Sequence, residues 1–210
     1  MLIDIINKMT PESLVQLLTD IAAKKGYSIF NKGDYNLNIW NIRSTSKLSN
    51  SFDDVQVIFY YDNDKLKVKT FRITTDPGKD SLLKPRNSSG TFILKPNQYK
   101  GCWKLGYHKG KTDHPALVQI APVTGYRDRN KNDILDMDDR TIVTGMYGIN
   151  CHRASAWRLL EYVGLYSEGC QVHYDPNRYN KEFISLIQDA IECHGNRFTI
   201  TLITEKDLYE

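Results

Sequence analysis

The chain has 210 residues, of which 40% are hydrophobic, 11% are aromatic and 25% are charged, and its formal net charge is +3. This length and composition fit one globular domain with a short N-terminal appendage, and the aromatic side chains supply enough apolar surface to exclude intrinsic disorder. The basic residues are dispersed, so we expect no nucleic-acid partner. No apolar run approaches the roughly 18 residues of a spanning helix, so we expect no membrane span, and no signal peptide is visible.

One amphipathic helix is predicted near the N-terminus. Thr10 is a typical N-cap, Pro11 suits the first helical position, and Gly26 follows the last apolar repeat as a stop signal. This helix and the polar connector after it form a predicted N-terminal unit of residues 1–36. Residues 37–210 form the predicted main domain.

Short β-rich runs bounded by turn residues dominate the main domain. Val55–Tyr60 and Leu66–Ile73 flank the turn-forming cluster at residues 62–64, so they are predicted to pair as a hairpin. The other predicted strands are residues 37–42, 90–94, 103–107, 116–120, 141–146 and 197–203.

Two more helices are predicted, at residues 154–163 and 180–193, and the second carries a clear apolar stripe. The resulting fold class is mostly β (α+β). It has the N-terminal helix, a helical insert between His152 and Cys170, and a C-terminal helix followed by a strand.

The segment around His152 and Cys170 is the most informative for chemistry. His152 ends a predicted strand, and Cys170 closes the tight turn Ser167-Glu168-Gly169-Cys170. A cysteine nucleophile reacts as its thiolate, and a histidine beside it either removes the proton or stabilises an ion pair. Gly169 permits a turn that other residues avoid, and the Cys170 amide is well placed to meet an oxyanion.

These residues resemble the signature of the L,D-transpeptidase catalytic domain, in which a histidine precedes a Ser/Thr-His-Gly-Cys turn by roughly fourteen to seventeen residues. Fourteen residues lie between His152 and Ser167 here. Ser89–Leu94, with the sequence SGTFIL, also resembles the Thr-Pro-x-Gly-x-Phe-x-Ile strand of that family. The resemblance spans about residues 55–172 and implies a β-sandwich or mixed sheet, with residues 37–210 as the catalytic domain.

The resemblance assigns roles to five catalytic-site residues. Cys170 would be the nucleophile that forms the acyl intermediate, and His152 would be the general base. Ser167 and Gly169 would shape the turn, while the main-chain carbonyl of Arg153 would orient the imidazole.

Two departures from the family pattern point to substrate contacts. Glu168 stands where the family has histidine, and Gln171 follows Cys170 where the family has a hydrophobic residue. We therefore expect Glu168 and Gln171 to contact the substrate, and we expect His108 to line the same groove.

The resemblance implies that the chain is a cysteine acyl transferase or peptidase whose partner is the peptidoglycan stem peptide. The expected site of action is the bacterial cell wall, which the protein would reach by phage delivery or as part of an exported longer precursor. Alternatives are a phage lysin or virion-associated wall hydrolase using the same site, a non-catalytic module that binds the wall or a virion partner, and a cysteine peptidase for proteins. In the simplest alternative, Cys170 is a buried structural thiol and His152 a core histidine.

One further motif suggests a cation. A twelve-residue segment beginning at Asp128 places oxygen-bearing side chains at spacings that resemble a calcium loop. The predicted ligands are Asp128, Asn130, Asn132, Asp136 and Asp139. A solvated acidic turn is the alternative, because the sixth position of the segment is not glycine and the twelfth is not glutamate. Thiol chemistry requires no cofactor, so a structural Ca²⁺ is the single cofactor that the sequence suggests.

Overall fold

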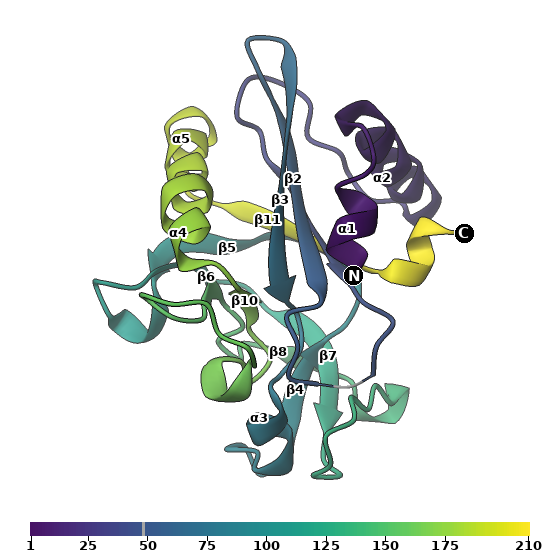
Figure 1. Ribbon diagram of the computed structural model, residues 1–210, viewed down its shortest axis with the longest axis vertical. Helices are drawn as coiled ribbons and strands as arrows, with labels where there is room; N and C mark the ends of the chain where they lie inside the picture. Colours follow the sequence, from purple (N-terminus) through teal and green to yellow (C-terminus); the bar gives the residue numbers. More distant parts are fainter. Residues whose placement is uncertain (48) are drawn as a thin grey trace.

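The computed structural model describes residues 1–47 and 49–210. One group of strands comprises β1 (Asn38–Arg43), β2 (Asp54–Asp62), β3 (Lys65–Thr74), β5 (Asn97–Tyr107), β6 (Pro115–Gln119), β9 (Cys151–Arg153), β10 (Gln171–His173) and β11 (Phe198–Thr204). These eight close into a barrel in the order β1-β11-β5-β6-β9-β10-β3-β2. A second sheet contains β4 (Thr91–Leu94), β7 (Val123–Asp128) and β8 (Val143–Gly145), and it lies below the barrel in Figure 1.

Helices cover the strands from outside. They are α1 (Leu2–Ile6), α2 (Pro11–Lys25), α3 (Lys79–Leu83), α4 (Pro176–Arg178) and α5 (Ser185–His194), with a π-helical turn at Tyr179–Ile184 joining the last two. Short 3₁₀ turns occupy His108–Gly110, Asp139–Thr141, Gly164–Tyr166 and Glu205–Leu208. The chain is therefore a mixed α/β protein. None of the helices in the described part of the chain is long and apolar enough to cross a bilayer.

The predicted N-terminal helix is confirmed as α2. The Thr10 hydroxyl accepts the main-chain N–H of Ser13 at 3.2 Å, and Gly26 ends the helix in a left-handed conformation. The preceding short helix α1 was not expected. Leu18 of α2 shares a core cluster with Trp40 of β1 and Val57 of β2, so residues 1–36 pack directly against the barrel.

The predicted hairpin is also confirmed, as β2 and β3. Asn63 and Asp64 connect the strands with φ values of 50° and 59°, a conformation that suits asparagine and aspartate. The hairpin extends beyond the rest of the barrel in Figure 1. Its partner β1 alternates between two cores, because Ile39 faces the cluster that contains α5 and Trp40 faces the one that contains α2.

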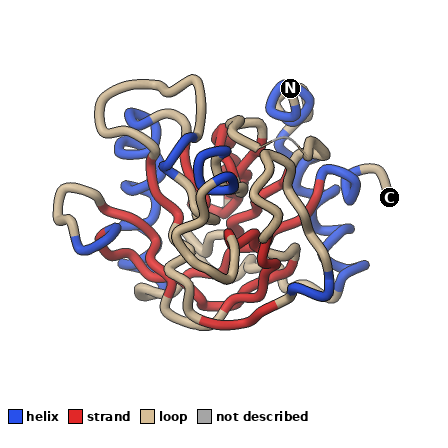
Figure 2. Tube along the Cα trace, turned by 90° about the horizontal axis from the view of Figure 1, so that it is seen from below, coloured by secondary structure: helices blue, strands red, loops and turns tan. Residues whose placement is uncertain are grey.

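The predicted C-terminal helix and final strand are confirmed by α5 and β11. The strand inserts between β1, to which it is parallel, and β5. In Figure 1, α5 and α2 flank the strands from opposite sides, and both chain ends lie on the side of α2. Figure 2 shows from below how loops gather at the end of the barrel that carries the small sheet.

The predicted helix at residues 154–163 does not form. This segment consists of bends and irregular backbone, and a single 3₁₀ turn at Gly164–Tyr166 follows it. The hydroxyl of Ser155 accepts the N–H groups of Trp157 and Arg158, which offers the backbone a local alternative to helical hydrogen bonds. Ala154 and Val163, at the two ends of the segment, are buried, but Trp157 between them is 91% exposed, so the segment buries no continuous apolar stripe that could stabilise a helix.

Candidate active site

The pairing of β9 with β10 sets His152 and Cys170 on one face. These strands are parallel, with Cys151 opposite Gln171 and His152 opposite Val172. Because side chains alternate along a strand, Cys170 lies on the same face as Val172 and therefore on that of His152. Both residues line a cleft of about 360 Å³ together with His108, Tyr147, Gly148, Asn150 and Glu168, among others.

The imidazole of His152 has the orientation that a general base needs. Its Nδ1 lies 2.8 Å from the carbonyl oxygen of Arg153, where an Nδ1–H donates and leaves Nε2 free to accept a proton. Among the described residues, Nε2 is buried and has no hydrogen-bond partner. Burial, with a contribution from nearby His108, holds the pKa of His152 well below 6.5, so the ring is neutral at pH 7.

Cys170 is half-buried, and its sulfur is held by two main-chain groups. The thiol donates to the carbonyl oxygen of Gly148, and the sulfur accepts the N–H of Asn150, each at 3.5 Å. Burial raises the pKa of Cys170 to about 11, while the Asn150 N–H acts in the opposite direction. Thiol and imidazole are thus both neutral in the free protein, which is the arrangement of a general base rather than that of an ion pair.

The turn before Cys170 is closed by Ser167. Its hydroxyl donates to the carbonyl oxygen of Cys170 at 2.8 Å and accepts the N–H of Gly169 at 3.2 Å. Gly169 has a φ of 119°, a region that other residues rarely adopt, and a Cβ atom there would collide with the carbonyl oxygen of Phe92. The predicted turn-shaping role of both residues fits these contacts.

Replacing Gly169 with alanine is expected to lower the free energy of unfolding by about 3 kcal/mol, since backbone strain and the collision with Phe92 add together. Urea unfolding monitored by circular dichroism measures the change. Gly26→Ala is the matched control, because Gly26 also has positive φ but open space around its Cβ position. If both variants lost the same stability, the close packing at Gly169 would have no energetic role.

His108 lies in the cleft, as expected, and the ring of a second histidine, His114, packs beside it. The ring centroids of His108 and His152 are 4.0 Å apart, and those of His114 and His152 are 5.3 Å apart. Burial lowers the pKa values of His108 and His114 to about 4, so these rings add no charge beside the base at pH 7. Sequence reasoning missed His114, although the two histidines flank a short Lys-Gly-Lys turn that returns the chain.

Of the two residues near Cys170 that were predicted to contact the substrate, Glu168 lies in the cleft and Gln171 does not. Glu168 lines the cleft and forms an ion pair with Arg86 at 3.2 Å. Gln171 does not reach the cleft: it is fully buried on the opposite face and hydrogen-bonded to Asn41. The prediction for Gln171 was wrong because a strand begins directly at that residue, and its side chain points away from that of Cys170.

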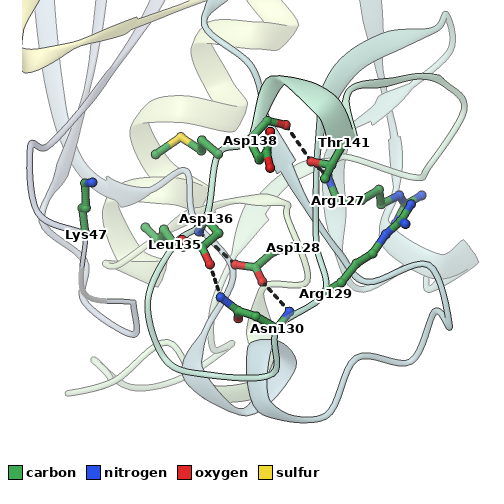
Figure 3. A pocket seen from close by; sticks show the side chains of 10 residues that line it. Lys47, Arg127, Asp128, Arg129, Asn130, Leu135, Asp136, Asp138 and Thr141 are labelled. Atoms are coloured by element: carbon green, nitrogen blue, oxygen red, sulfur yellow. Dashed lines mark hydrogen bonds between the residues drawn. The ribbon is translucent and has the colours of Figure 1, made fainter.

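In the acidic loop that begins at the end of β7, side chains predicted to bind calcium form hydrogen bonds within the loop (Figure 3). The carboxylate of Asp128 accepts the N–H groups of Asn130 and Asp136, and the side chain of Asn130 donates to Asp136. The Asn132 side chain accepts a main-chain N–H, while Asp139 pairs with a lysine. Within residues 1–47 and 49–210, no group of three or more His, Cys, Asp or Glu side chains is arranged to hold a metal. Calcium binding by this loop stays a prediction.

Asn150 and Tyr147 were not singled out from the sequence, yet both belong to the cleft. Asn150 contacts the Cys170 sulfur through its N–H and the His108 ring through its side chain, at 3.5 and 3.2 Å. Their position directly before Cys151-His152 was the available signal. Comparison with protein-family models, curated proteins and solved structures finds no match to this chain.

Proposed function

We propose that the chain is a cysteine-dependent acyl transferase or peptidase that acts on the peptidoglycan stem peptide through a thioester on Cys170. The observation that carries the proposal is the parallel pairing of β9 and β10, with a neutral imidazole and a half-buried thiol on one face of one cleft. The resemblance to L,D-transpeptidases supplies the substrate class. The hydrogen bond from His152 to Arg153 supports the choice of base.

In the first proposed step, the Cys170 sulfur attacks the scissile carbonyl carbon while its proton moves to Nε2 of His152. This step requires rotation of the Cys170 side chain, because the thiol in the free protein donates to Gly148. The main-chain N–H of Cys170 is the proposed oxyanion donor. Breakage of the C–N bond then expels the amine, which takes the proton from His152 and leaves the thioester.

In the second step, an amine or water attacks the thioester carbonyl. His152 takes the proton of the attacking group and returns it to the departing sulfur, so the thiol is restored. An amine as acceptor gives a cross-linked peptide. Water gives hydrolysis, the reaction of a phage lysin or virion-associated wall hydrolase.

Mass spectrometry of muropeptides incubated with the protein tests the proposal. The wild type should release the terminal D-amino acid or join two peptides, and Cys170→Ala should do neither. Cys193→Ala is the matched control because Cys193 is an exposed free thiol that does not line the cleft, and it should retain full activity. Equal product from the Cys170→Ala variant would contradict the proposed nucleophile.

A non-catalytic module that binds a wall peptide or a virion partner is the second candidate. The raised pKa of Cys170 and the pairing of Glu168 with Arg86, where the resembled family has histidine, favour it. It predicts peptide binding without any new muropeptide mass, and a similar affinity for the Cys170→Ala variant.

A further inference from the structure

A second cavity of about 340 Å³ adjoins the cleft that holds Cys170. Tyr147 and Glu168 line both hollows, so a ligand that reaches Cys170 at one end can extend past Tyr147 into the second. The other walls of this second cavity come from β4 and the residues before it, and from the end of β7, which contributes Arg127.

The Arg127 guanidinium is buried in the wall of the second cavity. The residue is only 7% exposed, and its Nη1 donates to the carbonyl oxygen of Gly90 at 3.0 Å. The guanidinium carbon lies 4.5 Å from the ring centroid of Tyr147 and 5.4 Å from that of Phe92. The two aromatic rings fix its position and partly compensate its charge.

Arg127 has no acidic partner within the described part of the chain. None of the ion pairs found among those residues includes it. The other charged side chains of this cavity, Arg86 and Glu168, pair with each other at 3.2 Å and neutralise one another. One positive charge is therefore left over on a buried side chain of this cavity, where a bound anion would relieve the cost of its burial.

We propose that Arg127 binds a carboxylate of the peptide whose scissile carbonyl reaches Cys170. The identity of that peptide rests on the proposed function. A planar guanidinium matches a carboxylate through two parallel hydrogen bonds, and in the structure only Nη1 of Arg127 is engaged by a described residue. Two carboxylates of a stem peptide fit this chemistry: the C-terminal one of the D-amino acid and the one on the side chain of a diamino acid.

Calorimetric titration of the Cys170→Ala protein with three synthetic stem peptides distinguishes which of the two carboxylates Arg127 binds. The first peptide carries both carboxylates, the second ends in a carboxamide, and the third has lysine in place of meso-diaminopimelate. The peptide that lacks the carboxylate bound by Arg127 should bind about 10- to 100-fold more weakly than the first.

Substitutions of Arg127 in the same background identify the site. With Arg127→Gln the three peptides should bind equally and weakly. With Arg127→Lys the peptides should still differ in affinity, but less, because lysine keeps the charge and lacks the paired N–H donors of the guanidinium. Arg127→Lys also decides the case if Arg127→Gln fails to fold. Arg197→Gln, an exposed arginine outside both cavities, should leave the discrimination unchanged.

Equal affinity of the three peptides for the starting protein, or no binding of any of them, would overturn this role of Arg127. Product formation by the protein with Cys170 intact is measured separately on the same peptides. Catalysis without carboxylate discrimination would leave the proposed function standing and remove the Arg127 site. Discrimination without any product would support the Arg127 site and contradict the thiol chemistry.

Discussion

Replacing His152 with glutamine is expected to slow the proposed turnover of the stem peptide about 10²- to 10⁴-fold at pH 7. The reason is that the Cys170 thiol, with a pKa raised to about 11, is almost fully protonated at that pH and needs a base to take its proton. His152 lines the same cleft, and its buried Nε2 has no hydrogen-bond partner among the described residues. Steady-state kcat/KM on a synthetic stem peptide measures the loss.

The same substitution is expected to change the pH dependence. In the wild type the base is neutral above its pKa, which burial holds well below 6.5, and the thiol is neutral below about 11, so kcat/KM should stay level from pH 7 to pH 9. Without the base only the thiolate reacts, so the rate of His152→Gln should rise about tenfold per pH unit. His194→Gln, on an exposed histidine outside the cleft, should keep the level profile. A level profile in His152→Gln would exclude His152 as the base.

Replacing Arg43 with methionine is expected to lower the free energy of unfolding by about 3 to 5 kcal/mol, which is the cost of breaking a buried charged network. Arg43 is 1% exposed and pairs with Asp76 at 2.8 Å. It also donates to the hydroxyl and carbonyl oxygens of Thr75 and to the carbonyl oxygen of Leu94. The network therefore ties β1 to the segment after β3 and to the small sheet.

The pH dependence of the loss identifies its cause. Burial raises the pKa values of Asp54 and Asp76, and Arg43 and a hydrogen bond to Thr75 act in the opposite direction. Without Arg43 both pKa values in the folded protein rise further above those of the unfolded chain. The folded protein then loses stability as the pH rises toward these pKa values, because ionising a carboxyl group costs more in the folded state. The gap between Arg43→Met and the wild type should therefore widen from pH 5 to pH 8.

Urea unfolding at the two pH values gives the measurement. Arg140→Met is the control because Arg140 lies in an exposed ion pair with Asp138, and removing it should cost little stability at either pH. A loss for Arg43→Met that matched this control would show that the buried network contributes no net stability.

Local structure was predictable where local interactions decide it. The helix start at Thr10 and its end at Gly26, and the turn at Asn63 and Asp64, follow from backbone preferences that act within a few residues. The helix predicted at residues 154–163 failed for the complementary reason. Its composition suits a helix, but its buried residues, Ala154 and Val163, lie at its two ends while Trp157 between them is exposed, so it buries no continuous apolar stripe.

The sequence by itself determined which groups are available for chemistry: a thiol after a glycine turn, and a histidine at a distance that lets the chain leave and return. The tertiary structure alone decided that β9 and β10 pair in parallel, that the rings of His108 and His114 pack against His152, and that Gln171 points into the barrel. It also decided that Arg127 faces a second cavity. The physical reason is that strand partners and register depend on contacts between distant residues, and a shift of one residue exchanges the two faces of a strand.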